Sequence, residues 1–470
     1  MIRKDLRALL TLALPLVLAQ VAQTSMGFVD TLMVGRLGQA QLAAIALGST
    51  LFHLLQIVLS GVIFAVSPLV SQAVGANDIY KAGRAVRQGL WLALLLFMVG
   101  STVYWNAGPL LLGMGQDPAT VVLSTSYLRA IAWGLLPALG VAALRGLLEG
   151  TGVTRPIMLI SFVGVGFNVV ANNALMFGHW GFPELGLVGT GYASSLSLGL
   201  IFVLTALYIA SRQGRYGVFG GFRWPHLATL KELLRVGVPI GLTLGFEGGM
   251  FAATAFLMGL LGPAQLAAHQ IALQTASITF MVPLGLALAT TARVGQATGR
   301  GDRASAARAG FTGIAASAFF MCFTALTFWL APRFIVGLYL DLSDPQNAEV
   351  VRLAQLFLGM AAMFQIFDGF QVSAAGALRG LKDTRVPMLI TLVAYWVIGI
   401  GSAALFCFGL GFGGRGLWFG LVLGLGVAGV LLSLRFSRLV SRERVAVQEI
   451  ETPGESKRVS APLSPSSPTD

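Results

Sequence analysis

Charged residues are scarce in this chain. Only 11% of its 470 residues are Asp, Glu, Lys or Arg, whereas a soluble domain carries about 25%. Apolar runs long enough to span a bilayer recur along most of the sequence instead. These runs lack the short alternation of apolar and polar residues that is typical of an outer-membrane β-barrel. The composition therefore predicts an all-α polytopic membrane protein.

Motifs of hydrolytic and metal chemistry are also missing. The chain has no GxxxxGK(S/T) phosphate loop, so it shows no sign of ATP hydrolysis, and it has no HExxH motif. Its four histidines do not cluster. The two cysteines, Cys322 and Cys407, lie in separate apolar runs without metal-like spacing, and we interpret them as packed free thiols. We therefore expect neither an enzyme nor a bound cofactor.

Twelve apolar runs are long enough to cross a membrane. Their predicted bounds are 7–35, 42–73, 86–106, 121–148, 156–178, 186–211, 231–260, 265–296, 307–330, 349–378, 386–409 and 415–438. The first run lacks a signal-peptide cleavage site, and we interpret it as a retained helix. The predicted domains are an N-terminal six-helix bundle (1–211), a cytoplasmic linker (212–230), a C-terminal six-helix bundle (231–441) and a disordered cytoplasmic tail (442–470).

Lys and Arg lie mainly on one side of the predicted membrane. If successive loops alternate between the two sides, all but five of the 31 basic residues fall on the side that holds both termini. The exceptions are Arg36, Arg129, Arg333, Arg352 and Arg415. Because cytoplasmic loops are enriched in Lys and Arg, we predict a multi-pass protein of the cytoplasmic (inner) membrane with both termini in the cytoplasm. The net charge of +12 then reflects topology rather than nucleic-acid binding.

The two halves of the chain repeat one another. GRLGQAQLAAIAL returns as GLLGPAQLAAHQIAL, and TRPIMLI returns as TRVPMLI. VSQAVGANDIYKAGRA returns as VGQATGRGDRASAARA, which keeps Gln72 in register with Gln296 and Asp78 in register with Asp302. Since six spans return the chain to its original side, we predict a parallel repeat of two six-helix bundles.

Three acids lie well inside the predicted spans, at Asp30, Glu247 and Asp368. An acid at the centre of a membrane helix costs about 2.5 to 3.5 kcal/mol on insertion scales. No Lys or Arg lies deep in any predicted span, so we expect no ion pair to satisfy these acids. We interpret all three as cation-coupling groups, and the alternative is a purely structural role.

Further polar residues of the N-terminal half are expected near Asp30. Asn168 and Asn172 are four residues apart and therefore share one helical face. We expect Thr190, at the start of the next span, to complete an oxygen-rich cluster with them. Such oxygens suit a monovalent cation or a proton relay, and they serve equally as hydrogen-bonding groups between helices.

Pro15 and Pro239 occupy matching places in the first span of each half. A proline inside a helix frees a carbonyl and bends the helix. The two bends are either hinges of a gating movement or static kinks, and we retain Pro15 and Pro239 as hinge candidates.

From about residue 5 to residue 440 the sequence resembles the multidrug and toxic compound extrusion (MATE) transporters, in particular the NorM-type branch. The resemblance rests on PLVLAQVAQTSMGFVDTLMVGRLG in the first span and SQAVGANDIYKAG after the second. It also rests on LRGLLEGTGVTRPIMLISFVGVGFNVVANN, on VGVPIGLTLGFEGG in the seventh span and on ALRGLKDTRVP after the tenth.

The resemblance implies two six-helix bundles that form a V around a central cavity, and export of organic cations driven by inward Na⁺ or H⁺. It places Glu247 and Asp368 in a cation site of the C-terminal half, for which Na⁺ and H⁺ are the two candidate ions. It assigns to a polar cluster of the N-terminal half Asp30, Asn168, Asn172 and Thr190. Members that use Na⁺ often have a tyrosine where this chain has Phe364, one turn before Asp368. The choice between Na⁺ and H⁺ therefore stays open.

The leading hypothesis is secondary active multidrug efflux, which contributes to antibiotic resistance. We expect small cationic amphiphiles and membrane lipid as partners, no nucleic acid, and a monomer. One alternative is a flippase or exporter of a lipid-linked or other metabolite, whose anionic cargo would require Lys or Arg in the cavity. Another is a membrane scaffold without transport, which would not need buried acids.

Overall fold

The computed structural model describes residues 2–221 and 224–451 of the chain. Within these ranges the chain forms helices joined by turns and contains no strand. Twelve helical stretches are long and apolar enough to cross a membrane. The predicted all-α membrane fold with twelve spans is therefore confirmed.

The first six spans form the N-terminal bundle. Its elements are α1 (Ile2–Val34), η1 (Gly35–Leu37), α2 (Gln39–Ile63), α3 (Val66–Gly75), α4 (Ile79–Trp105), α5 (Ala107–Gly113), α6 (Pro118–Thr151), α7 (Arg155–Phe177), η2 (His179–Gly181) and α8 (Gly186–Arg212), followed by η3 (Gly214–Tyr216). α2 and α3 belong to one span that is interrupted beside Phe64. Pro68 explains the interruption, because it has no N–H to bond the Phe64 carbonyl.

The last six spans form the C-terminal bundle. Its elements are α9 (Leu227–Leu260), α10 (Pro263–Gly299), α11 (Arg303–Leu330), α12 (Pro332–Gly337), η4 (Pro345–Asn347), α13 (Ala348–Gly380), α14 (Arg385–Leu392), η5 (Val393–Ile400), α15 (Gly401–Ala404), η6 (Leu405–Gly409) and α16 (Gly414–Glu451). The eleventh span is irregular because η5 and η6 are π-helical. Such segments are rare and occur frequently at functional sites.

The predicted linker and tail lie partly outside the described residues. Residues 222–223 of the linker and 452–470 of the tail are not among them. The backbone of α16 continues to Glu451, past the predicted start of the tail at 442. The disorder of the tail and the domain boundaries stay predictions.

The repeat is visible in the caps of equivalent helices. Asp78 begins α4, and its side chain accepts a hydrogen bond at 2.8 Å from the backbone N–H three residues later. Asp302 begins α11 with the same bond at 2.9 Å. A carboxylate at this position satisfies an N–H that the helix itself leaves free. The register of Asp78 with Asp302 therefore reflects a shared structural role.

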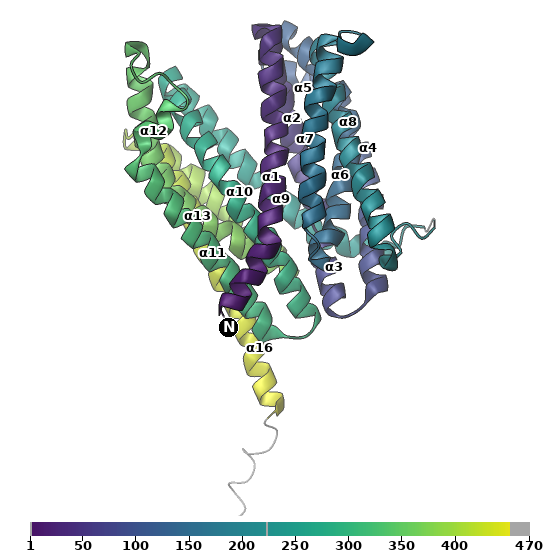
Figure 1. Cartoon of the computed structure of the whole chain (residues 1–470). Coiled ribbons are helices and arrows are strands. Elements are labelled where there is room, and N and C mark those ends of the chain that lie inside the picture. Colours follow the sequence, from purple (N-terminus) through teal and green to yellow (C-terminus); the bar gives the residue numbers. More distant parts are fainter. Residues whose placement is uncertain (1, 222–223, 452–470) are drawn as a thin grey trace, which may run out of the picture.

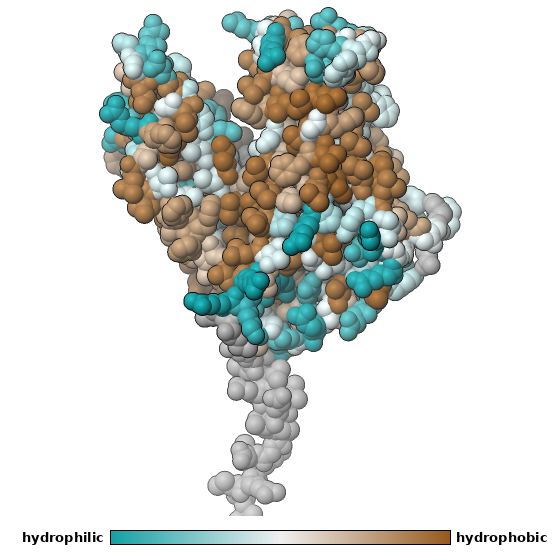
Figure 2. All heavy atoms as spheres, in the orientation of Figure 1, coloured by the Kyte–Doolittle hydropathy of each residue, from teal (hydrophilic) through white to brown (hydrophobic). Residues whose placement is uncertain are grey.

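The two bundles form a V (Figure 1). They meet at the end of the molecule that carries the N-terminus, here called the closed end, and separate toward the opposite, open end. α1 packs against α10, and α2 packs against α9. Figure 2 shows a notch between the bundles at the open end and an apolar band across the middle, with hydrophilic residues at both ends. A band of this kind is what a bilayer requires of a spanning protein.

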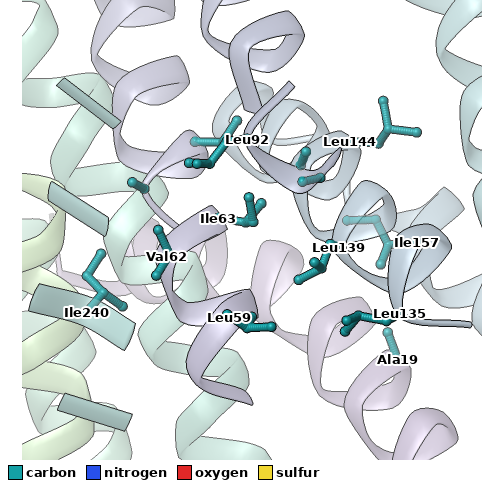
Figure 3. Packing of buried hydrophobic residues seen from close by; sticks show 14 of the residues in the cluster. Ala19, Leu59, Val62, Ile63, Leu92, Leu135, Leu139, Leu144, Ile157 and Ile240 are labelled. Atoms are coloured by element: carbon teal, nitrogen blue, oxygen red, sulfur yellow. The ribbon is translucent and has the colours of Figure 1, made fainter. Parts of the chain in front are cut away.

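The largest apolar core crosses from one bundle into the other (Figure 3). It joins Val62 and Ile63 of α2 and Leu139 of α6 to Ile240 of α9. A second core, around Trp418, lies within the C-terminal bundle. Since the bundles separate toward the open end, this shared core would have to rearrange for the closed end to open.

Candidate functional site

Asp30 of α1 is 6% exposed, and both of its carboxylate oxygens accept hydrogen bonds. Asn172 of α7 donates to Oδ1 at 2.6 Å, and Ser194 of α8 donates to Oδ2 at 2.6 Å. Asn168 connects the two donors, since its amide donates to Ser194 at 3.3 Å and its carbonyl accepts from Asn172 at 3.2 Å. Charge-assisted bonds of this kind are strong. Three helices therefore hold the N-terminal acid in a hydrogen-bonded network.

The structure brings together three of the four residues predicted for this cluster. Asn168 and Asn172 share one face of α7 and point at Asp30, as their spacing predicts. Thr190 is not among the hydrogen-bond partners of Asp30, because its hydroxyl donates to the sulfur of Met176 at 3.1 Å, and its place in the cluster stays a prediction. Ser194, one turn later on the same face of α8, takes the expected place. The four-residue spacing from Thr190 was the signal that could have identified it.

The acids of the C-terminal half are less well satisfied. Asp368 of α13 is 5% exposed, and its Oδ1 has no hydrogen-bond partner among the described residues. Glu247 of α9 is half-buried and near enough to interact electrostatically with Asp368. Two like charges repel strongly where water is excluded. A cation shared by both carboxylates would remove this repulsion.

Two further buried oxygens belong to this site. The Tyr395 hydroxyl of η5 and the side-chain oxygen of Gln371 also lack hydrogen-bond partners among the described residues. Tyr395 lies beside Gln371 and within electrostatic range of Glu247 and Asp368. Carboxylate, amide and hydroxyl oxygens are the ligands that hard cations prefer. Although Phe364 provides no hydroxyl, the site therefore contains other oxygens that could act as ligands.

The position of Phe364 itself is apolar. Its side chain is 2% exposed, and its ring packs edge-on against Phe251 and Trp418, with centroid distances of 5.9 and 5.7 Å. Edge-to-face packing of aromatic rings is favourable. The ring therefore contributes to the core behind Asp368.

Two arginines contradict the expectation that no basic residue lies deep in a span. Arg145 of α6 approaches Glu149 at 3.6 Å and donates to two glutamines of α1 at 3.0 and 3.1 Å. Arg379, near the end of α13, is half-buried and within electrostatic range of Glu247. Arg145 lies in the last turn of its predicted span and Arg379 directly after the end of its span, but a long side chain can extend from a helix end into the protein. Glu149 is a further buried acid, 7% exposed, that the prediction omitted.

The hinge candidates lie inside long helices. Pro15 is within α1, which bends in its N-terminal part (Figure 1), and Pro239 is within α9. The Thr243 hydroxyl donates to the Pro239 carbonyl at 2.8 Å. Such bonding of a hydroxyl to the preceding turn also bends helices. The bend of α1 is visible, and the use of Pro15 and Pro239 as hinges stays a prediction.

Cysteine and metal chemistry play no evident part in the described residues. Both cysteines are free, as predicted, but Cys322 is exposed on the bundle surface and only Cys407 is packed. No three His, Cys, Asp or Glu side chains within the described ranges form a cluster that could hold a metal ion.

Comparison with known proteins identifies close relatives of the whole chain. The MatE family matches residues 15–173 and 239–405, one segment in each half. A probable multidrug resistance protein NorM of a Synechococcus species is 41% identical over 457 residues, which cover 96% of this chain and 98% of that protein. The protein of the same name from Pseudomonas putida is 43% identical, over 93% of this chain and 95% of its own length.

Solved structures show the same fold. A eukaryotic MATE transporter superposes with a TM-score of 0.84 at 22% identity, over 95% of this chain and 99% of that chain. A multidrug resistance MATE family transporter in an outward-facing conformation also gives a TM-score of 0.84 at 22% identity, over 93% of this chain and 96% of that chain. At this identity the similarity establishes the fold, with its two bundles.

Proposed function

The chain belongs to the MatE family, and from this membership we propose that it is a secondary active multidrug efflux transporter that exports organic cations by antiport with Na⁺ or H⁺. Its relatives are named probable multidrug resistance proteins. The observation that carries the proposal is the buried Asp368 carboxylate, one oxygen of which accepts no hydrogen bond from the described residues. An incompletely paired acid inside a membrane protein is costly, and binding a cation removes that cost.

In the proposed cycle, drug and coupling cation compete for the same acids. When Glu247 and Asp368 face outward, Na⁺ or H⁺ neutralises them and the cationic drug leaves. When they face the cytoplasm, they lose the ion and regain affinity for drug. Competition is required because independent binding would let the ion gradient dissipate without export. At a potential of about 100 mV, the exchange gains about 2.3 kcal/mol for each net positive charge that it moves inward, which corresponds to roughly fifty-fold accumulation.

The proposal includes either coupling ion. Na⁺ requires several oxygen ligands, and Glu247, Asp368, Gln371 and Tyr395 provide such oxygens in one region. A proton requires the carboxylates alone. Asp30 is a second coupling acid in this scheme, but its network with Asn172 would have to open before it could bind a cation.

We further propose the orientation and the partners of the protein. Basic residues on the side of both termini favour a cytoplasmic (inner) membrane location with the closed end in the cytoplasm. The open end then faces outward. The protein acts as a lipid-embedded monomer on cationic amphiphiles, and the scheme involves no cofactor, nucleic acid or enzymatic step.

Ethidium efflux from proteoliposomes tests the proposal, with a Na⁺ gradient or a pH gradient imposed alone. The wild-type chain is expected to export ethidium with at least one of the two gradients, and Glu247→Gln combined with Asp368→Asn is expected to lose this efflux. Glu349→Gln, an exposed acid of α13, is the matched control and should retain it. Normal ion-driven efflux by the double variant would refute the proposal.

A further inference from the structure

At the closed end, α3 of the N-terminal half lies against α10 of the C-terminal half. Two glutamine side chains cross between the halves there in opposite directions. Gln72 Nε2 donates to the Gly380 carbonyl at 2.8 Å, and Gln296 Nε2 donates to the Gly150 carbonyl at 2.9 Å. Each half therefore contributes one donor and one acceptor.

The internal repeat relates these four groups. Gln72 and Gln296 occupy the same place in VSQAVGAND and VGQATGRGD. Gly150 and Gly380 each lie four residues before the repeated TRPIMLI and TRVPMLI segments. Each also lies two residues before a residue in the left-handed conformation, with φ of 80° and 60° respectively. The two hydrogen bonds are therefore equivalent under the repeat.

Both acceptors are carbonyls at helix ends. Gly150 lies in the last turn of α6, and Gly380 is the last residue of α13. The last four carbonyls of an α-helix have no partner within the helix. Each glutamine amide thus satisfies a free helix end of the opposite half.

Glycines allow the two backbones to approach this closely. A Cβ added at Gly75 of α3 would collide with the Gln296 carbonyl, and a Cβ added at Gly299 of α10 would collide with the Gln72 carbonyl. Gly75 and Gly299 are themselves equivalent in the repeat. The contact is therefore self-complementary, as in a two-fold interface between identical subunits.

An ion pair at the same end has no such counterpart. Asp5 of α1 accepts a hydrogen bond from Arg293 of α10 at 2.8 Å. The equivalent positions of the repeat hold Thr229 and Leu69. The two glutamine hydrogen bonds thus follow the internal repeat, whereas the Asp5–Arg293 ion pair does not.

We propose that Gln72 and Gln296 form a reciprocal latch that holds the closed end together, and that its release opens the transport pathway to that side. This inference rests on the proposed function, since a transporter must open each end in every cycle. Neutral hydrogen bonds suit a reversible latch because each adds little net stability. When the halves separate, the amides and the carbonyls form hydrogen bonds with water instead of with each other.

Ser71 offers a reporter for the latch. It is fully buried beside Gln72, and a Cβ added at Gly295 of the other half would collide with its hydroxyl. In a background with Cys322→Ser and Cys407→Ser, Ser71→Cys should be shielded while the halves touch. A membrane-impermeant maleimide supplied at the closed end will react with it only when they separate, so the labelling rate measures the open fraction.

The test compares Gln72→Glu and Gln296→Glu, singly and combined, because glutamate keeps the shape of glutamine and its carboxylate cannot donate a hydrogen bond. Each single change should raise the labelling rate at least about tenfold, because it removes a hydrogen bond and places a carboxylate against a carbonyl oxygen. The two effects should be similar, and the combined effect larger. Gln116→Glu, exposed outside this contact, is the matched control and should leave the rate unchanged.

Labelling of the combined variant at the parent rate would overturn the latch. If a glutamate variant does not fold, as judged by size-exclusion chromatography, Gln72→Asn and Gln296→Asn replace it, since their amides are too short to reach. Ethidium efflux by the parent on the same vesicles tests the proposed function separately. If labelling of the glutamate variants is raised but the parent shows no efflux, the latch is supported and the proposed function is overturned. If labelling is unchanged and the parent exports ethidium, the latch is overturned and the proposed function is supported.

Discussion

The two halves of the molecule hold their buried acids differently. Asp30 accepts a hydrogen bond on each carboxylate oxygen, from Asn172 and Ser194, both at 2.6 Å. Asp368 leaves Oδ1 without a partner among the described residues and lies near a second acid, Glu247. A fully hydrogen-bonded carboxylate is stable without a cation, whereas an incompletely paired one gains from binding a cation. We therefore expect ion exchange mainly at the C-terminal site in this conformation.

Equivalent positions of the two halves carry different charges around these sites. Glu247 corresponds to Gln23 of the N-terminal half, and Arg379 corresponds to Glu149. In the N-terminal half, Arg145 binds Gln23 at 3.0 Å and approaches Glu149 at 3.6 Å, so these groups satisfy one another. The same scaffold thus carries one acid paired with Arg145 in the N-terminal half and two acids with Arg379 in range of Glu247 in the C-terminal half. The chemistry has diverged while the fold repeats.

The largest expected effect belongs to Asp368→Asn. This change should abolish ion-driven ethidium efflux and leave thermal stability unchanged or higher, because it removes an unpaired buried charge. Efflux from proteoliposomes and thermal unfolding in detergent measure the two quantities. A clear loss of stability with efflux retained would break the comparison between the halves.

Asp30→Asn should show the opposite balance. The change removes the charge that two donors share, and it should cost about 3 kcal/mol of unfolding free energy, since hydrogen bonds to charged groups contribute about 1.5 to 3 kcal/mol each. Ion-driven efflux should continue at a reduced rate. The same unfolding assay on Asp368→Asn gives the difference in unfolding free energy between the two variants. Equal unfolding free energies would contradict the difference between the two acid sites.

Two hydroxyl variants on one face of α8 sharpen the account of the N-terminal site. Ser194→Ala should cost about 2 kcal/mol, because it leaves Asp30 Oδ2 without its donor. Thr190→Ala should cost less than about 1 kcal/mol, because it removes only a contact with the Met176 sulfur. Thermal unfolding of the two variants provides the measurement. A larger loss for Thr190→Ala would restore the assignment that the sequence suggested.

The smallest expected effect concerns the coupling ion. If Na⁺ drives efflux, Tyr395→Phe should raise the half-saturating Na⁺ concentration about fivefold, as one lost oxygen ligand of about 1 kcal/mol implies. If H⁺ drives efflux, the variant should behave like wild type. Leu405→Met, at an exposed position of the same span, is the control and should leave the Na⁺ response unchanged. An unchanged response of Tyr395→Phe in a Na⁺-driven protein would exclude Tyr395 as a ligand.

Much of the fold could be predicted because the bilayer imposes it. The thickness of the hydrocarbon sets the length of each apolar run, so the twelve spans are evident without a structure. Helical spacing places Asn168 and Asn172 on one face, and an acid inside a span is conspicuous by its cost. These features depend on local sequence alone.

The remaining site residues depend on tertiary geometry. Thr190 and Ser194 share one face of α8, and only the packing of that helix decides which hydroxyl reaches Asp30. Tyr395 lies in a π-helical segment, where side chains depart from the regular α-helical spacing. Arg379 starts at a helix end, and its reach toward Glu247 depends on how α13 and α9 are placed. Sequence spacing does not determine any of these relations.

The central claim is that the coupling ion exchanges at the acids of the C-terminal half. Its most direct test is the charge movement of proteoliposomes on a solid-supported membrane after a jump in Na⁺ or H⁺ concentration, without drug. Wild type and Asp30→Asn should both give a transient current, and Glu247→Gln with Asp368→Asn should give none. A current that persists in the double variant and disappears in Asp30→Asn would contradict the claim.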